Sequence, residues 1–98
     1  MRPLSSDFTE EDKRPYFLWD EDISLREFKQ RLAGSDPADR LRMLAKLMRE
    51  ARDTDVWVFI TPQEAADALP HLTRKLGRRQ GFWDFLISGW RRHGVIAR

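Results

Sequence analysis

Hydrophobic residues recur at helical spacing over most of the chain, and this pattern predicts a set of short helices with marked ends. The clearest helix covers residues 37–52. Its apolar stripe consists of Leu41, Leu44, Ala45, Met48 and Ala51, with Leu47 beside it. Asp36 and Pro37 predict where the helix begins, because aspartate accepts hydrogen bonds from free amides and proline suits the first turn.

Two shorter helices begin at capping boxes, in which a hydroxyl side chain and a glutamate three residues later satisfy each other's backbone amides. Ser24 and Glu27 predict a helix over residues 25–33, for which Gly34 would provide a left-handed end. Thr61 and Glu64 predict a short helix to about Leu69, which is ended by Pro70.

The last predicted helix covers residues 80–93 and ends at Gly94. Its apolar face is predicted to consist of Phe82, Phe85, Leu86, Gly89 and Trp90, widened by Trp83 and Ile87. Residues 71–81, which precede it, have the composition of a basic connector with room for one helical turn.

Residues 53–60 are ambiguous. The run from Val56 to Ile60 has the composition of a strand, but a lone strand would leave its backbone groups unpaired. We therefore predict a short buried helix capped by Thr54 or Asp53, with a strand as the alternative.

The N-terminal part lacks this periodicity. We expect residues 1–13 to form a flexible segment and residues 14–20 to form an extended aromatic arm, because Pro15 disfavours helix at the residue before it. A chain of 98 residues has room for one core, so residues 14–98 form one predicted domain. The fold class predicted is all-α: a compact bundle of about five short helices with an extended N-terminal aromatic arm.

The composition adds a compartment and an asymmetry of charge. The chain has no cysteine, no apolar run of the roughly 20 residues that span a bilayer, and a polar N-terminus, so we expect a cytoplasmic protein. Residues 1–22 carry a net charge of −4, and residues 68–98 carry +6. Either the basic end attracts phosphate or an acidic partner, or the acidic end folds back onto it.

No residue pattern indicates catalysis. His71 and His93 lack metal-ligand spacing, and the serines show no nucleophile motif. The acidic run Asp20-Glu21-Asp22 lacks the ligand spacing of a calcium loop, which favours a solvated turn. The sequence therefore favours a non-enzymatic binding protein without a cofactor or metal.

Two groups of residues are candidates for binding. Tyr16, Phe17 and Trp19 on the predicted arm either anchor in a partner's groove or clamp across the chain's own helices. We favour the clamp, with Trp19 buried in the monomer or in a homodimer.

The second group is a basic run that predicts nucleic-acid binding as the alternative function. It consists of Arg74, Lys75, Arg78 and Arg79. In a helix these residues would share a face that could contact phosphates, and Phe82 and Trp83 would offer rings for stacking on bases. A solvated surface and a core position for Phe82 are the simpler interpretation.

The segment from Arg14 to about Arg92 resembles a family of small uncharacterised bacterial proteins. Family members are often encoded beside a nucleotidyltransferase-like toxin of the abortive-infection type. The residues that carry the resemblance are Pro15–Asp20, Arg49–Arg52, Asp55–Trp57, Thr61–Glu64, Leu69-Pro70, Phe82-Trp83 and Trp90. The resemblance implies an antitoxin-like or accessory protein that binds such a partner, and it carries over no functional residue.

Overall fold

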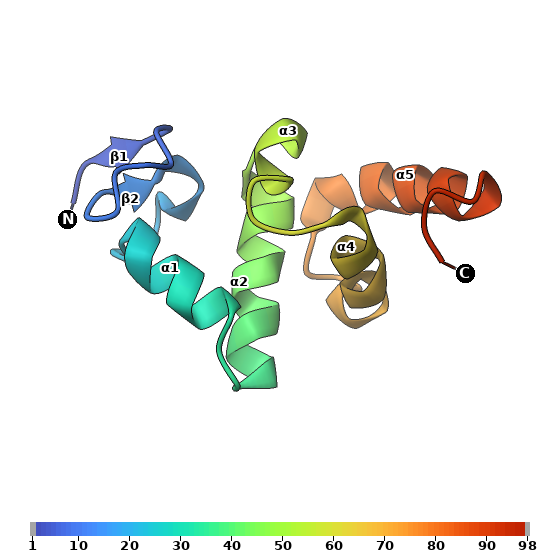
Figure 1. Ribbon diagram of the computed structural model, residues 1–98, viewed down its shortest axis with the longest axis horizontal. Helices are drawn as coiled ribbons and strands as arrows, with labels where there is room; N and C mark the ends of the chain where they lie inside the picture. The colour runs from blue at the N-terminus through green and yellow to red at the C-terminus, as the bar shows by residue number, and fades with distance from the viewer. Residues whose placement is uncertain (1, 98) are drawn as a thin grey trace.

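The computed structural model describes residues 2–97 and confirms the all-α class, with five α-helices and almost no strand. Figure 1 shows their arrangement. The elements in chain order are β1 Leu4–Ser5, β2 Arg14–Pro15, the 3-10 helix η1 Tyr16–Leu18, α1 Leu25–Leu32, α2 Pro37–Glu50, α3 Asp53–Val56, α4 Pro62–Ala68, the 3-10 helices η2 Leu69–Leu72 and η3 Gly77–Arg79, and α5 Gln80–Arg92.

Helix α2 lies at the centre, between the N-terminal elements with α1 on one side and α4 with α5 on the other (Figure 1). Its predicted start is confirmed, since the Asp36 carboxylate accepts hydrogen bonds from the amides of residues 38 and 39. The helix is buried more widely than one stripe. Met43, which lies outside the predicted stripe, has no exposed surface, whereas Leu41 and Leu44 are only half-buried.

The cap of α1 is confirmed in part. The Ser24 hydroxyl accepts a hydrogen bond from the Glu27 amide at 3.1 Å. The left-handed end predicted at Gly34 is wrong, because the positive-φ glycines among the described residues are Gly77 and Gly94. Gly34 instead packs closely against the end of the helix, where a Cβ atom would lie 3.3 Å from the carbonyl oxygens of residues 30 and 31.

A short helix is confirmed in part of the ambiguous stretch, because α3 covers residues 53–56 with Val56 buried, whereas residues 57–59 form a turn and no strand. The predicted caps of the helix are wrong. Arg52 occupies the N-cap position, and no side chain of α3 caps the helix. The Tyr16 hydroxyl accepts a hydrogen bond from the Arg52 amide at 2.8 Å instead. A residue distant in the sequence therefore satisfies the amide of the N-cap residue, and no side chain caps the first turn of α3.

The capping box of α4 is complete, because Thr61 and Glu64 each accept a hydrogen bond from the other's backbone amide. The α-helix ends at Ala68 with Leu69 as its C-cap, as predicted for a helix ended by Pro70, and the chain continues as a 3-10 helix. The missing amide of Pro70 is tolerated in the first turn of η2, which follows α4 directly.

Helix α5 has the predicted extent, and Gly94 follows it with a φ of +74°. Its predicted apolar face is wrong at Phe85, whose side chain is 76% exposed. The helix instead buries Trp83 and Ile87. The indole Nε1 of Trp83 donates a hydrogen bond to the Met48 carbonyl at 2.8 Å, which fixes the side of α5 that faces α2.

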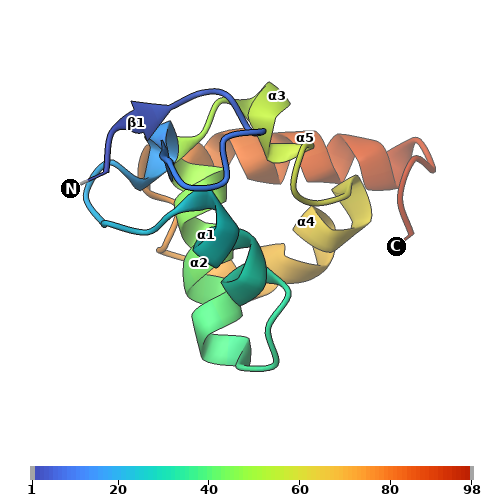
Figure 2. The same cartoon turned by 60° about the vertical axis from the view of Figure 1, so that its left-hand side comes forward.

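The N-terminal segment has more structure than the sequence indicates. Leu4–Ser5 pairs in parallel with Arg14–Pro15. The carbonyls of Glu11 and Lys13 accept hydrogen bonds from the amides of residues 26 and 25 at the start of α1. Figure 2 shows this segment beside α1. The predicted arm is extended only as far as Pro15, because the next three residues form η1.

Candidate binding surfaces

The aromatic arm contributes mainly to the core. The Phe17 side chain has no exposed surface, and its ring lies 5.1 Å from that of Phe28 and 5.7 Å from that of Phe59. The prediction that Phe17 contacts a partner is therefore wrong for this conformation. The clamp interpretation holds for Phe17, although the backbone that carries it is a 3-10 turn.

Tyr16 joins the arm to the junction between α2 and α3. Its hydroxyl donates a hydrogen bond to Asp55 Oδ2 at 2.5 Å, and the Arg52 guanidinium lies 5.1 Å from its ring centroid. Burial raises the pKa of Tyr16 above its usual value of 10.0, and the hydrogen bond to Asp55 raises it further. Tyr16 therefore has a structural role that leaves little of it available to a partner.

Trp19 is the one residue of the three that is largely exposed, at 56%. Its indole Nε1 lies 3.4 Å from Glu50 Oε2. The predicted burial of Trp19 in the monomer is wrong, because η1 turns the chain so that Phe17 and Leu18 occupy the core and Trp19 follows outside it.

A groove, which we call the apolar groove, runs between α1, α2 and α4. Its main part encloses about 600 Å³. The residues that line this part are Leu32, Ala33, Pro37, Arg40, Leu41, Leu44, Ile60, Glu64, Asp67, Ala68 and His71. A second hollow of about 290 Å³ shares four of these residues and adds Lys29, Val58 and Phe59.

The two hollows make one continuous surface. The half-buried side chains of Leu41 and Leu44 lie in it, and Val58 at one end is 57% exposed. Carboxylates of Glu64 and Asp67 line one edge, on α4, while Arg40 lies on α2. The groove therefore offers an apolar floor with charges of opposite sign on its two walls.

A third hollow, which we call the cation pocket because arginine and lysine line most of it, lies between α2 and the turn after η2. It encloses about 500 Å³ and is lined by Ala38, Arg42, Ala45, Lys46, Arg49, Arg74 and Lys75. The three cations of α2 follow one another at spacings of four and three residues, which places them along one face of the helix.

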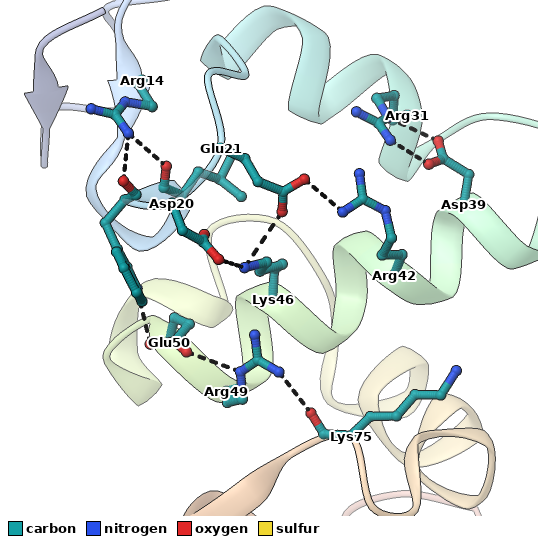
Figure 3. Close-up of polar contacts among 12 residues, drawn as sticks. Arg14, Asp20, Glu21, Arg31, Asp39, Arg42, Lys46, Arg49, Glu50 and Lys75 are labelled. Carbon is teal, nitrogen blue, oxygen red and sulfur yellow. Dashed lines mark hydrogen bonds and ion pairs between the residues drawn. The ribbon is translucent and has the colours of Figure 1, made fainter. Parts of the chain in front are cut away.

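Carboxylates of the N-terminal segment and of α2 itself pair with the cations on α2 (Figure 3). Lys46, whose side chain is only 10% exposed, pairs with Asp20 and lies 3.4 Å from Glu21 Oε2. Arg42 pairs with the other oxygen of Glu21 at 2.6 Å. The hydrogen bond from Lys46 lowers the pKa of the Asp20 carboxyl below its usual range. The acidic end therefore folds onto α1 and α2, and not onto the basic end as one interpretation had it.

The predicted basic run does not form one helical face. Arg74 has a φ of +69°, and a turn separates η2 from η3. Only Arg74 and Lys75 line the cation pocket, whereas Arg78 is exposed outside it. Arg79 lies over the Phe82 ring at 4.8 Å.

The rings proposed for stacking on bases are occupied or covered. Trp83 has no exposed surface, and Phe82 is half-buried beneath Arg79. The sequence missed Arg42, Lys46 and Arg49 as pocket residues, although their spacing on a secure helix was a usable signal.

The other candidates for chemistry lie apart. His71 lines the apolar groove, and His93 follows the end of α5. Asp22 accepts a hydrogen bond from the Arg2 amide, so the acidic run is engaged by cations and an amide. Within residues 2–97, no group of three metal-ligand side chains is placed to hold an ion. No helix of these residues has the length and apolarity needed to cross a membrane.

Comparison with known proteins found no matching family model, no matching curated protein and no matching solved structure.

Proposed function

We propose that this chain is a non-enzymatic protein-binding module that receives an apolar segment of a partner protein in the apolar groove. The observation that carries the proposal is the continuous groove between α1 and α4, with half-buried leucines of α2 in it and Val58 exposed at one end. An amphipathic helix laid in such a groove buries its apolar face, which is a common mode of peptide recognition.

The charges beside the groove define the segment that fits it. A helix with lysine or arginine toward Glu64 and Asp67, and a carboxylate toward Arg40, would complement both walls. The resemblance to small proteins encoded beside nucleotidyltransferase-like toxins supports a nucleotidyltransferase-type partner, for which this chain would be antitoxin-like or accessory. A second copy of this chain is the other partner to be tested.

Co-expression with the product of the neighbouring gene, followed by size exclusion, tests the proposal. We expect one peak containing both proteins at micromolar concentration. Elution of two separate proteins would contradict the partner, and elution of this chain alone as a dimer would point to self-association.

Two matched variants test the groove itself. Ala33 is exposed, lies at the end of α1 and lines both hollows, so Ala33→Trp fills the groove without removing a core side chain. Ser88→Trp adds the same side chain at an exposed position on α5, which does not line the groove. We expect only Ala33→Trp to abolish the complex. A complex that survives Ala33→Trp would place the contact elsewhere, and Trp19→Ala is the next variant to test.

The alternative function, nucleic-acid binding, has weaker support. The four predicted residues are divided between the cation pocket, the surface and a ring contact. Only Arg74 and Lys75 of the four line the cation pocket, which is a compact hollow and not an extended surface.

A further inference from the structure

The cation pocket differs from the other hollows in the charge of its lining. Five of its seven lining residues are arginine or lysine, the other two are alanine, and no carboxylate among residues 2–97 lines it. Ala38 and Ala45 leave the space between the cations unfilled, because their side chains end at Cβ. A hollow of this kind has donors for an anion, and the carboxylates nearest to it are those that pair with its α2 cations.

The positive charge of the pocket is only partly neutralised. Carboxylates pair with Arg42, Lys46 and Arg49 and hold these side chains in place. Within the described chain, Arg74 and Lys75 make no ion pair, although both line the pocket. The helix therefore provides cations that are already oriented, and the turn provides cations whose charge is unmatched.

The turn that carries these two residues is fixed at both ends. Leu72 and Leu76 on either side of it are fully buried, and Arg49 donates a hydrogen bond to the Lys75 carbonyl at 3.4 Å. Figure 3 shows Arg49 directed at this carbonyl. The arrangement holds Arg74 and Lys75 between two anchored residues, in the turn that lines the pocket together with α2.

Arg74 adopts this position at a cost. Its φ of +69° is the only positive φ of a non-glycine residue within residues 2–97. Glycine or asparagine adopts this conformation more easily than arginine, and Arg74 adopts it where the chain turns after η2, directly after the C-cap residue Thr73. Strained backbone of this kind is concentrated at functional sites, where the side chain it presents is needed.

We propose that the cation pocket binds a phosphate group, held between Arg74 and Lys75 of the turn and the cations of α2. Phosphate matches the pocket because it carries up to two negative charges and several acceptor oxygens, and arginine pairs with it in a bidentate geometry. The open hollow of about 500 Å³ has room for more than one phosphate, so a diphosphate or triphosphate also fits it. This site is independent of the apolar groove and of any partner bound there.

Three sources share this chemistry: free pyrophosphate, the phosphates of a nucleotide, and the backbone of a nucleic acid. Calorimetric titration at fixed ionic strength and neutral pH distinguishes them, with pyrophosphate, adenosine triphosphate and a short single-stranded oligonucleotide as the probes. We expect pyrophosphate and the triphosphate to bind. Binding of the oligonucleotide alone would overturn the compact site and support an extended nucleic-acid surface, and binding of none of the three would overturn the proposal outright.

A pair of charge-matched variants tests the residues. Arg74→Gln with Lys75→Gln removes the two cations of the turn from the pocket, and Arg78→Gln with Arg92→Gln removes two exposed cations that do not line it. We expect the first variant to weaken pyrophosphate binding by about tenfold or more, and the second by less than about twofold. Equal weakening in both variants would show a general effect of charge and would overturn the site.

Arg74→Gly separates binding from folding. Glycine relieves the unfavourable backbone conformation, so we expect an unchanged or higher melting temperature together with weaker binding of pyrophosphate. A lower melting temperature with undiminished binding would show that Arg74 is structural and would overturn its assignment to the site.

Discussion

The two parts of the chain, residues 2–55 and residues 56–97, share one core but differ in how their charged side chains are paired. Every ion pair among the described residues joins two residues of the first part. The second part has six cations and three carboxylates but no ion pair within residues 56–97. Its indole rings pack against one another instead. The ring centroid of Trp57 lies 5.6 Å from that of Trp83 and 5.4 Å from that of Trp90.

The difference has consequences for stability and for binding. Ion pairs at an exposed surface each contribute little, about 0–1 kcal/mol, so they add only modestly to the buried side chains of the first part, such as Phe17 and Phe28. A buried indole contributes several times more, so the second part depends on few strong points. The unpaired cations of the second part are also the ones whose charge is available to a ligand.

Trp83→Ala should have the largest effect, because Trp83 is the fully buried contact between α5 and α2. Truncation of a buried aromatic residue typically costs about 3–5 kcal/mol, against a total stability of roughly 5–15 kcal/mol for a domain. We expect a melting temperature lower by many degrees in circular dichroism. A shift of only a few degrees would show that α5 is held by other contacts.

Trp83→Phe sharpens the same test. It keeps a ring in the core but leaves the Met48 carbonyl without the hydrogen bond from Nε1. The expected loss is about 1–3 kcal/mol, the cost of an unpaired buried polar group, and it should lie between the wild type and Trp83→Ala.

Tyr16→Phe should have a smaller effect, because it removes two hydrogen bonds at a half-buried position in the first part. We expect a loss of about 1–2 kcal/mol. The pKa of Tyr16 is raised in the folded protein, so its contribution is fully present below pH 10 and is lost as the pH rises through the higher folded pKa. The gap in melting temperature between wild type and variant should therefore narrow above about pH 10, and a constant gap would contradict this.

The part of the fold that could be predicted is local in the sequence. Caps such as Asp36 and the pair Thr61 and Glu64 satisfy amides a few residues away, so their partners are visible in the sequence. Tyr16 caps the junction at Arg52, 36 residues further on, and no local signal shows that contact. The same limit explains why the pairing of Leu4–Ser5 with Arg14–Pro15 was not predicted, since two residues are too short a strand to show a pattern.

The face of α5 and the candidate site were misread for a related reason. Periodicity gives the spacing of an apolar face, but it does not show which of two overlapping faces packs against a neighbouring helix. In α5 the face with Trp83 packs against α2, where the indole donates a hydrogen bond, and Phe85 is left exposed. The basic run was correctly identified as cationic. Arg74 and Lys75 of this run line one pocket with Arg42 and Arg49 only because the turn packs beside α2. The spacing of residues in the sequence does not show where a turn packs.

Acid should weaken the first part more than the second. The hydrogen bond from Arg31 lowers the pKa of Asp39 below 3.8 in the folded protein. The stability from this pair is therefore present above the unfolded pKa and is lost as the pH falls through the folded one. We expect hydrogen exchange between neutral pH and about pH 3, after correction for its intrinsic pH dependence, to show α1 losing protection before α5. Asp39→Asn should reduce the difference, and earlier loss in α5 would contradict the comparison.

Trp19→Ala should have the smallest effect on stability, although it removes the same side chain as Trp83→Ala. Trp19 is 56% exposed and its polar contact to Glu50 is long, at 3.4 Å, so its removal leaves no cavity in the core. Surface substitutions of this kind usually change the free energy of unfolding by less than about 0.5 kcal/mol, which is within about two or three degrees of melting temperature for a chain of this size. The same substitution at Trp19 and at Trp83 therefore compares the stability lost at an exposed indole with the stability lost at a buried one. A large drop for Trp19→Ala at high protein concentration that disappears on dilution would show that the indole is buried between two copies of the chain. A large drop at every concentration would show that Trp19 packs inside the monomer and would contradict its exposure.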